Sequence, residues 1–567
     1  MNPSHAARPR LSRLYRVYRP AVHGETLLAL TAAFIMLAGN GRFWHAALAG
    51  RPWSEPATWL FAGAIFVTLA CFYFAAAALV SSRRTVRPVL ALCLLVTAAA
   101  SYYMDRYAIY LDRAMVRNVL ATNYKEAVEL LGWGMARHML LFGIVPAGLL
   151  WWPVLERRSW RRAAAVRAAW IAGAVLLGVG SALAIFADFA SLVRNQPEVR
   201  HLVTPGNAVA SLMRNAWGHA ARGKEPLTVV AADAHRIASG KPRPMLFVLV
   251  VGETARAQNF SLNGYPRETN PELARRNVIN FPDATACGTS TEVSLPCMFS
   301  VYGRGHYDED KILSHESVLH VLARTGVQVV WRDNQSGCKG VCKGLPDEQL
   351  SHAKVPALCA NGQCLDEILV HGMDRLLQDA NGNMLVVMHQ LGSHGPAYFR
   401  RYPPAFRKFL PACESDELRQ CTQQEIVNAY DNSILYTDAV LGKVIDFLQG
   451  AQATHDTAML YVSDHGESLG EGGLYLHGMP WAIAPQVQTR VPFVLWLSPA
   501  FRAAERIDEA CLRTRARTQA VSHDWLFNTL LGTFDVRTRA YDPALDVFAA
   551  CRSPRSREKT TVGMTRR

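Results

Sequence analysis

Three side chains of the kinds that bind metals follow two apolar segments of the chain. Glu253 comes two residues after the run MLFVLVV, and Asp464 and His465 follow the run AMLYVS. Two carboxylates and an imidazole are suitable ligands for Zn²⁺, and three protein ligands leave a coordination position for a reacting oxygen. Taken singly, each residue is more typical of a solvated loop end or a helix cap. Their shared position after apolar runs favours a zinc site.

The segment CGTSTEVSLPC contains a candidate nucleophile. Thr291 lies in it between Cys287 and Cys297. A threonine hydroxyl is a poor nucleophile at neutral pH, but coordination to zinc favours the alkoxide and prepares it to attack phosphorus. A disulfide across the segment would hold this oxygen in place. A cluster of Ser and Thr residues is equally typical of a helix N-cap, so the residue types alone leave both interpretations open.

Compact apolar runs separated by helical patterns are expected to position these residues. The runs span residues 245–251, 327–332, 384–390, 458–463 and 492–497. Continuous runs of this length are typical of strands buried on both faces. With helices between them, they predict a parallel α/β sheet covered on both sides. Ligands bind beyond the carboxyl ends of such strands, so Glu253, Asp464 and His465 are expected to share one cleft.

The first third of the chain contains uncharged stretches that are candidate membrane helices. They span residues 26–41, 57–80, 88–104, 139–155 and 168–187, each near the ~20 residues needed to cross a bilayer. Basic residues mark alternate connecting segments, as cytoplasmic loops require: Arg8, Arg10, Arg13, Arg16 and Arg19; Arg83, Arg84 and Arg87; Arg157, Arg158, Arg161, Arg162 and Arg167. The pattern predicts a cytoplasmic N-terminus, five crossings, no cleaved signal peptide, and a large domain on the far side.

The formal net charge of +14 does not indicate nucleic-acid binding. Residues 1–200 hold 22 Lys and Arg against 9 Asp and Glu, which leaves 38 against 37 in the rest of the chain. The excess is confined to short segments between apolar runs, and no broad basic face with interleaved aromatics is apparent. Membrane lipids are therefore the expected partners.

Between and beyond the membrane stretches, the chain divides into further segments. A polar loop at 105–137 contains AMVRNVLATNYKEAVELL, which predicts an amphipathic helix outside the membrane. On that helix, Asn118, Thr122 and Glu126 would lie along one face. Residues 191–242 are predicted to form a connector, 243–552 a catalytic α/β domain, and 553–567 a disordered tail.

Ten of the twelve cysteines lie after residue 286, and an even set in one domain predicts disulfides in an oxidising compartment. Close spacing makes four pairs plausible: Cys287 with Cys297, Cys338 with Cys342, Cys359 with Cys364, and Cys413 with Cys421. Cys511 and Cys551 are left over and would form the fifth pair. Sequence does not prove this connectivity. A zinc ribbon is the alternative, but the chain has no two CxxC knuckles.

Five motifs in order resemble the phosphoethanolamine transferases that modify lipid A, a family that includes the colistin-resistance enzymes. They are GETARAQNFSLNGY, CGTSTEVSLPCMFS, DNQSGCKGVC, HQLGSHGPAYFRRYP and SDHGESLGEGGLYLHG. With the five crossings, the resemblance covers nearly the whole chain. It implies an alkaline-phosphatase/sulfatase-like domain in the periplasm of a bacterium, anchored in the inner membrane. It also implies that Glu253, Thr291, Asp464 and His465 form the zinc site, with Thr291 carrying the phosphoethanolamine.

The resemblance implies further residues at the substrate. Lys339, with Asn334 nearby, would meet the substrate phosphate, where a positive charge stabilises the transferring group. Four residues would line the substrate cleft: His389, His394, Glu467 and His477. In some relatives the matching residues hold a second zinc. His394 and His477 would also move protons. The residues that would contact the lipid headgroup are Asn118, Thr122 and Glu126. Each set also has an ordinary interpretation: an exposed lysine in a disulfide loop, structural histidines, and the wet side of an amphipathic helix.

The predicted function is transfer of phosphoethanolamine from phosphatidylethanolamine to a lipid A phosphate by a monomeric zinc enzyme, which implies polymyxin and colistin resistance. Alternatives are transfer to a core sugar of lipopolysaccharide, or glycerol-phosphate transfer of the lipoteichoic acid synthase type. A sulfatase is disfavoured because no Cys-x-Pro-x-Arg segment surrounds Cys297. A membrane sensor with an inactive enzyme domain is disfavoured by the intact residues Glu253, Thr291, Asp464 and His465.

Overall fold

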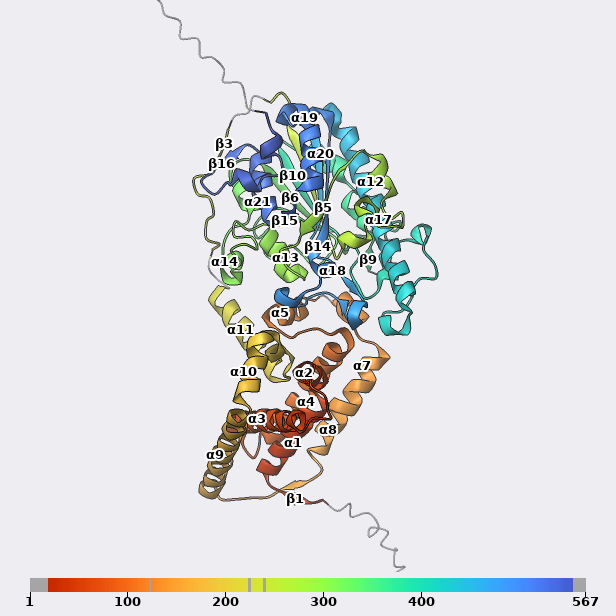
Figure 1. Cartoon of the computed structure of the whole chain (residues 1–567). Helices are drawn as coiled ribbons and strands as arrows, with labels where there is room; N and C mark the ends of the chain where they lie inside the picture. Colours follow the sequence, from red (N-terminus) through yellow and green to blue (C-terminus); the bar gives the residue numbers. More distant parts are fainter. Residues whose placement is uncertain (1–18, 123, 223–225, 238–240, 361, 554–567) are drawn as a thin grey trace, which may run out of the picture. The chain divides into compact units, whose positions relative to one another are not determined.

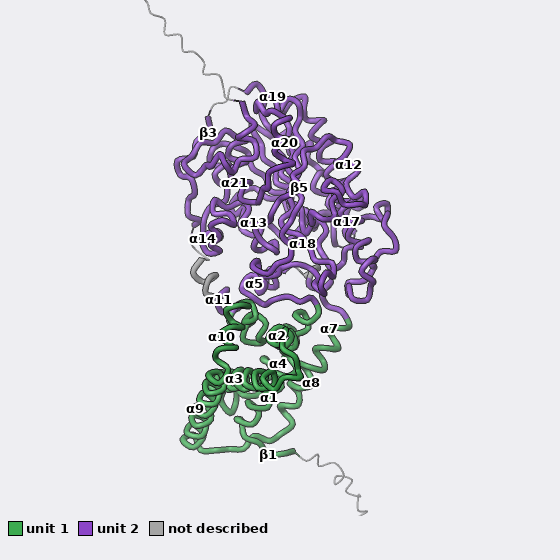
Figure 2. Tube along the Cα trace, viewed as in Figure 1, with its two compact units in different colours: residues 1–106, 133–210 green, residues 107–132, 211–567 purple. Residues whose placement is uncertain are grey.

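The computed structural model describes residues 19–122, 124–222, 226–237, 241–360 and 362–553, and the chain divides into two compact units (Figures 1 and 2). Unit 1 contains residues 1–106 and 133–210, and unit 2 contains residues 107–132 and 211–567. Most of the polar loop predicted at 105–137 therefore belongs to the same unit as the second half of the chain. The predicted tail, apart from Ser553, lies outside the described residues.

Three helices of the N-terminal third are long and apolar enough to cross a membrane: α3 (Pro56–Val80), α4 (Val86–Tyr107) and α9 (Trp160–Ala184). The pair α1 (Gly24–Ala38) and α2 (Gly41–Ala47) makes a fourth if counted as one span, although the chain bends by 65° between them. Within the described residues, helix length and composition thus support a membrane domain with three or four spans, against the five that the sequence predicts.

The remaining predicted span, 139–155, is divided among shorter helical segments. α7 (Trp133–His138) is followed by a π-helical turn at Met139–Ile144 and by α8 (Val145–Leu149). Pro146 lies at the start of α8 and has no backbone N–H to donate to the preceding turn. A widened π-helical turn next to such a residue interrupts the regular helix, so length alone does not identify this stretch as a span.

The centre of unit 2 is a sheet of eight strands in the order β15-β5-β14-β11-β4-β10-β6-β7 (Figure 1). Their bounds are β4 Met245–Gly252, β5 Ile279–Thr285, β6 Gln328–Asp333, β7 Asp347–Gln349, β10 Met384–His389, β11 Asp456–Ser463, β14 Arg490–Leu497 and β15 Val521–Ser522. The five predicted runs coincide with β4, β6, β10, β11 and β14, and every residue of β4 and β11 is buried. The sheet confirms the predicted α/β fold.

One predicted strand runs in the opposite direction to the others. β14 is antiparallel to both of its neighbours, β11 and β5, whereas the pairs among β11, β4, β10, β6 and β7 are parallel. The prediction of a parallel sheet is therefore wrong for residues 492–497. A strand buried on both faces is a continuous apolar run in either direction, so its sequence carries no information on orientation.

The sheet separates two hydrophobic cores. In β4, Phe247 and Leu249 belong to one core and Val248 and Val250 to the other, as the two-residue period of a strand requires. The first core includes residues of α13 (Thr291–Met298), α15 (Val318–Arg324), α19 (Pro499–Glu505) and α21 (Asp524–Thr533). The second includes residues of α12 (Pro271–Arg275), α16 (Met373–Gln378) and α17 (Gln423–Gly450). Helices thus cover both faces, and the carboxyl ends of the parallel strands meet at one edge.

The predicted amphipathic helix of the polar loop is two helices. α5 (Arg113–Ala121) ends before Thr122, whose backbone is extended, and α6 (Tyr124–Glu129) begins beyond it. The Thr122 hydroxyl donates to the Asn118 carbonyl at 2.8 Å, a local bond that competes with helix continuation in a residue of low helix propensity. The prediction that Asn118, Thr122 and Glu126 lie along one helical face is therefore wrong, and the side chain of Glu126 lies outside the described part of the chain.

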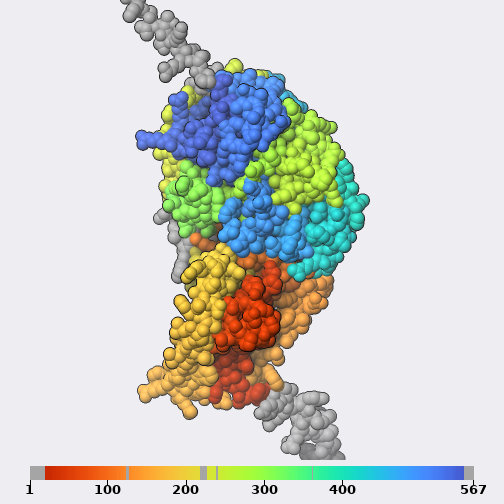
Figure 3. Space-filling model, in the orientation of Figure 1, coloured from red at the N-terminus to blue at the C-terminus, as the bar shows by residue number. Residues whose placement is uncertain are grey.

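Segments far apart in the sequence meet on the surface of unit 2 (Figure 3). Arg304, for example, lies over the ring of Trp481 at 4.3 Å from its centroid. Five disulfides fasten loops of this unit: Cys287–Cys297, Cys338–Cys342, Cys359–Cys364, Cys413–Cys421 and Cys511–Cys551. They are the pairs that chain spacing favours. The two remaining cysteines, Cys71 and Cys93, are unpaired.

Candidate active site

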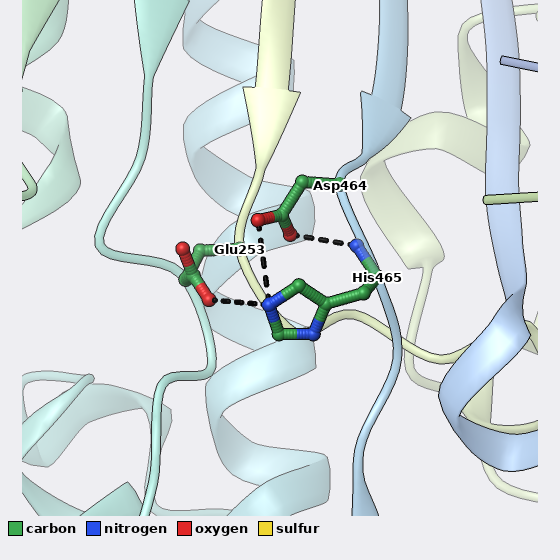
Figure 4. A group of neighbouring side chains, drawn as sticks. All are labelled: Glu253, Asp464 and His465. Atoms are coloured by element: carbon green, nitrogen blue, oxygen red, sulfur yellow. Dashed lines mark hydrogen bonds and ion pairs between the residues drawn. The ribbon is translucent and has the colours of Figure 1, made fainter. Parts of the chain in front are cut away.

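Glu253, Asp464 and His465 converge at the carboxyl edge of the sheet (Figure 4). The register of β4 and β11 pairs Gly252 with Ser463, so the residues that follow each strand lie side by side. His465 Nε2 is 3.3 Å from Glu253 Oε1 and 3.4 Å from Asp464 Oδ2. One potential ligand atom from each residue lies within 4.8 Å of the other two, and all three side chains are fully buried. The structure thus brings these residues together, as the strand pattern predicts.

The polar atoms of this cluster fit a metal cation. Glu253 Oε1 and Asp464 Oδ2 are buried without a hydrogen-bond partner, which is costly for a carboxylate oxygen. His465 Nδ1 lies 2.9 Å from the Gly466 carbonyl oxygen and donates to it, which leaves the lone pair of Nε2 facing the two carboxylates. A cation between Nε2 and the carboxylate oxygens would satisfy all three. Zn²⁺ fits this set of ligands.

Electrostatics within the cluster also favour a positive charge. Burial lowers the pKa of His465, but the charges of Asp464 and Glu253 raise it by more than burial lowers it, so that the pKa is about 10. Burial and the Glu253 charge raise the pKa of the Asp464 carboxyl to about 6. For Glu253, burial raises the pKa, yet the close contact with His465 and its charge outweigh this effect, so that the pKa lies below its usual range. Without a metal, a proton on His465 would supply the charge that the two carboxylates require.

Thr291 places its hydroxyl at the same cluster. It is the first residue of α13, and Ser290 precedes it with an extended backbone. Thr291 Oγ1 donates to Glu253 Oε2 at 3.0 Å and lies 3.4 Å from His465 Nε2. The free N–H groups and the dipole of a helix N-terminus favour negative charge at this position. The arrangement therefore suits an oxygen that becomes an alkoxide.

Two further histidines from the motifs, His394 and His477, lie beside this cluster. The ring centroids of His465 and His477 are 4.4 Å apart, and those of His477 and His394 are 5.4 Å apart. Glu467 accepts a bond from His477 Nδ1 at 2.9 Å and from the Tyr398 hydroxyl at 2.8 Å. Burial lowers the pKa of His394 to about 3, so this imidazole is neutral at physiological pH. The structure thus groups His394, Glu467 and His477 with the cluster.

His389 and Asn334 are held by buried carboxylates. His389 Nδ1 bonds Asp333 at 2.9 Å; burial lowers the His389 pKa, but the Asp333 charge raises it above its usual value. The Asn334 side-chain amide donates to Asp366 at 2.8 Å and to the Cys364 carbonyl at 3.0 Å. The amide N–H bonds of Asn334 therefore stabilise the loop that carries the Cys359–Cys364 disulfide.

Lys339 pairs with the acidic residue that follows the candidate nucleophile. Its ammonium group is 2.9 Å from Glu292 Oε1, and Glu292 follows Thr291 directly in α13. Both side chains are largely buried. Asn118 and Thr122, by contrast, are half-buried in and just after α5, where the Thr122 hydroxyl bonds the Asn118 carbonyl.

Comparison with known proteins decides the family. A family model described as phosphoethanolamine transferase EptA/EptB matches residues 69–219, and a sulfatase model matches residues 246–536. Phosphoethanolamine transferase EptA of Escherichia coli K12 is 39% identical over 96% of this chain and 99% of its own length. The chain belongs to the phosphoethanolamine transferase family.

Other members of the family cover this chain to a similar extent. Phosphatidylethanolamine transferase Mcr-1 of Escherichia coli is 36% identical over 92% of this chain and 96% of its own. The solved integral membrane lipooligosaccharide phosphoethanolamine transferase A of Neisseria meningitidis superposes with a TM-score of 0.90 at 36% identity, over 94% of this chain and all of that one. The membrane domain and the sulfatase-like domain are thus both family features.

Some residues of this transferase site are absent from the sequence prediction. Gln335 donates to Glu253 Oε2 at 3.2 Å. His523, also buried, accepts from the Cys287 backbone N–H at 3.0 Å and donates to the Ser463 carbonyl at 2.9 Å, so it joins the nucleophile segment to the strand before Asp464. Gln335 lies inside the DNQSG motif, so its position in that motif could have indicated a role at the site. His523 is isolated in the sequence, and no spacing pattern points to it.

Proposed function

We propose that this chain transfers phosphoethanolamine from phosphatidylethanolamine to a lipid A phosphate through a covalent intermediate on Thr291. The observation that carries the proposal is the Thr291 hydroxyl at a helix N-terminus, 3.0 Å from Glu253 and 3.4 Å from His465, within a buried set of candidate metal ligands. The names of the relatives support the donor, phosphatidylethanolamine, and an acceptor of the lipooligosaccharide class.

Glu253, Asp464, His465 and Thr291 would hold one zinc ion. When bound, the ion would lower the pKa of the Thr291 hydroxyl and neutralise charge on the phosphoryl oxygens. His394, Glu467 and His477 are close enough to the cluster to support a second, weaker ion as an alternative. The orphan oxygens of Glu253 and Asp464 support the first site more strongly.

In the first half-reaction, Thr291 Oγ1 attacks the phosphorus of phosphatidylethanolamine. The Thr291 proton leaves toward Glu253 Oε2, the acceptor of its hydrogen bond. The bond from phosphorus to the glycerol oxygen breaks, and diacylglycerol leaves after taking a proton from His477, since the neutral ring of His394 has no acidic proton to give. In the second half-reaction, a lipid A phosphate oxygen attacks the same phosphorus and its proton passes to His477. The bond from phosphorus to Thr291 Oγ1 breaks, and Glu253 returns the proton to Thr291. The phosphoethanolamine group thus passes intact from the donor to Thr291 and then to lipid A.

The remaining residues would bind the transferring group. The Lys339 ammonium group would meet the nonbridging phosphoryl oxygens, and Asn118, Thr122 and Glu126 would contact the donor headgroup, as the family resemblance implies. Charge on the phosphoryl group is then opposed by a lysine and by the N-terminus of α13, two preorganised positive groups. Asn334 and His389 would act through the loops that they fix.

The same proposal includes topology. An N-terminus in the cytoplasm, five crossings of the inner membrane and a periplasmic domain at residues 243–552 agree with the arginine pattern. We propose that the enzyme acts as a monomer. The five disulfides suit the oxidising periplasm. Five crossings require the bent pair α1–α2 and the segment from Trp133 to Leu149 to act as spans.

Mass spectrometry of lipid A from Gram-negative cells that express the wild type or Thr291→Ala tests the proposal. We expect a phosphoethanolamine adduct with the wild type alone, together with lower susceptibility to polymyxins because the added amine offsets phosphate charge. An adduct made by Thr291→Ala would refute the nucleophile. An adduct only on the lipopolysaccharide core, or a glycerol-phosphate adduct, would replace the acceptor or the donor with the corresponding alternative.

A further inference from the structure

The loop that connects α4 and α7 in the chain belongs to unit 2 (Figure 2). One of its arginines contacts the nucleophile helix. Arg117 of α5 donates from Nη2 to the backbone carbonyl of Glu292 at 2.9 Å, and its Nε lies 3.3 Å from Glu292 Oε2. Only 11% of the Arg117 side chain is exposed. Because Glu292 follows Thr291 directly, Arg117 holds the first turn of α13 by both backbone and side chain.

The carboxylate of Glu292 is divided between two cations. Oε2 faces Arg117, and Oε1 lies 2.9 Å from the Lys339 ammonium group. The exposed fractions of the Glu292 and Lys339 side chains are 7% and 8%, so water screens these contacts weakly. Arg117 also pairs with Glu309, so sharing the single Glu292 charge leaves the Lys339 ammonium group incompletely neutralised.

A second contact fixes α5 over the same site. Met115, two residues before Arg117, packs against Gly478, which follows His477. A Cβ atom at Gly478 would come within 2.3 Å of Met115 Cε, and Gly478 has a left-handed backbone with φ +90°. The Gly478 N–H donates to the Thr289 carbonyl at 2.7 Å. α5 therefore contacts Glu292 directly, and it contacts Gly478, whose N–H bonds the segment that precedes Thr291.

We propose that Arg117 is a positioning residue for the transfer reaction: it takes up part of the Glu292 charge, so that Lys339 stays available to the substrate phosphate, and it fixes the first turn of α13. This inference rests on the proposed function, from which the role of Lys339 comes. Without Arg117, Lys339 becomes the main counter-charge of Glu292 and is withheld from the phosphate.

The ion-pair network predicts that an Arg117 variant still folds. Glu292 keeps Lys339, and Glu309, which also pairs with Arg117, keeps Arg113 at 3.6 Å. Neither carboxylate loses every cation, which is the situation that destabilises a buried charge strongly. Arg113 offers a matched control, since it lies one turn earlier on α5 and pairs with Glu309 and with Asp310 at 3.1 Å.

The test is steady-state transfer by the full-length enzyme in detergent micelles containing phosphatidylethanolamine as donor and lipid A as acceptor, with kcat and KM measured separately. The variants are Arg117→Met, Glu292→Gln, the double variant and Arg113→Met, each with its thermal unfolding midpoint. We expect Arg117→Met to lower kcat/KM by about 10-fold or more, less than the ~100-fold typical of deleting a donor that touches the reacting group. Arg113→Met should stay within about 3-fold of the wild type, because Arg113 pairs with Glu309 and Asp310 rather than with Glu292.

The double variant separates charge sharing from a structural effect. Glu292→Gln removes the charge that captures Lys339, so the double variant should be several-fold more active than Arg117→Met alone. A double variant as inactive as Arg117→Met, or a loss in Arg113→Met equal to that in Arg117→Met, would overturn the inference. Unchanged activity of Arg117→Met beside an active wild type would overturn it and leave the proposed function standing, whereas an inactive wild type would overturn both.

Discussion

His523 makes the stability of this protein depend on pH in a way that one substitution can isolate. Its ring is 1% exposed, and burial lowers its pKa to about 4. Nδ1 accepts from the Cys287 N–H and Nε2 donates to the Ser463 carbonyl, so the neutral ring satisfies both backbone groups. A second proton on the ring would break the bond to Cys287.

The sign and size of the effect follow from linkage. An unfolded histidine has a pKa of ~6.5, so below that pH the unfolded state binds a proton that the folded state refuses. The stability contributed by the neutral ring is complete above pH ~6.5 and is lost as the pH falls toward about 4. The loss amounts to roughly 2 kcal/mol at pH ~5 and ~3 kcal/mol in total, since one pKa unit corresponds to ~1.4 kcal/mol.

His523→Gln is the informative variant because a glutamine amide can also donate to one backbone group and accept from the other. We expect the thermal unfolding midpoint of His523→Gln to fall less between pH 7.5 and pH 5 than that of the wild type. The difference should be a few degrees, at about 2–4 °C per kcal/mol. The exposed His235, changed to Gln, controls for the loss of a histidine as such.

Comparing variants at each pH cancels the titration of the metal ligands, which both proteins share. His523→Leu extends the test, since it leaves the Cys287 N–H and the Ser463 carbonyl unpaired at a cost of about 1–3 kcal/mol each at every pH. Equal sensitivity to acid in the wild type and His523→Gln would refute the assignment of a neutral, pH-sensitive ring.

Three further predictions concern the metal cluster and the polar loop. Gly392→Ala should lower bound zinc and activity more than about 10-fold, because the added Cβ would lie 2.5 Å from the Glu253 carbonyl oxygen. Gly326→Ala is the control: this glycine has φ +85° and open space around it, so the variant should show only the backbone strain of ~1–2 kcal/mol. Metal analysis of both purified variants decides this. Arg401→Met should destabilise the protein by roughly 3 kcal/mol in thermal unfolding, because Arg401 pairs with buried Glu129 at 2.6 Å. Adding Glu129→Gln should recover part of this loss. Additive losses from the two substitutions would contradict the pairing. Removal of metal with a chelator should abolish transfer and addition of Zn²⁺ should restore it, while activity that survives verified metal depletion would exclude the zinc mechanism.

The strands show which parts of the fold are encoded locally. Runs such as MLFVLVV and AMLYVS are fully buried strands, since only a central strand covered on both faces contains so many consecutive apolar residues. β5, INFPDAT, escapes this criterion because it contains a proline and an aspartate and is only partly buried. The orientation of β14 escapes it as well, because residue types do not depend on strand direction.

Local patterns were least reliable where one residue ends an element. The helical spacing of Asn118, Thr122 and Glu126 takes no account of the break that follows Ala121. Pro146 and the π-helical turn before it divide a stretch that is apolar throughout. In both cases the competing factor is backbone hydrogen bonding, which an average over many residues does not represent.

The sequence by itself determined the chemistry available to this protein: its motifs name the candidate metal ligands, the candidate nucleophile and the lysine, and its arginines and apolar stretches indicate a membrane enzyme. Only the tertiary structure decided which of these groups act on one another. Asp464 meets Glu253 because two strands pair in one register, and Arg117 meets Glu292 across 175 residues. Such contacts depend on the packing of elements distant in the chain, and no local spacing records them.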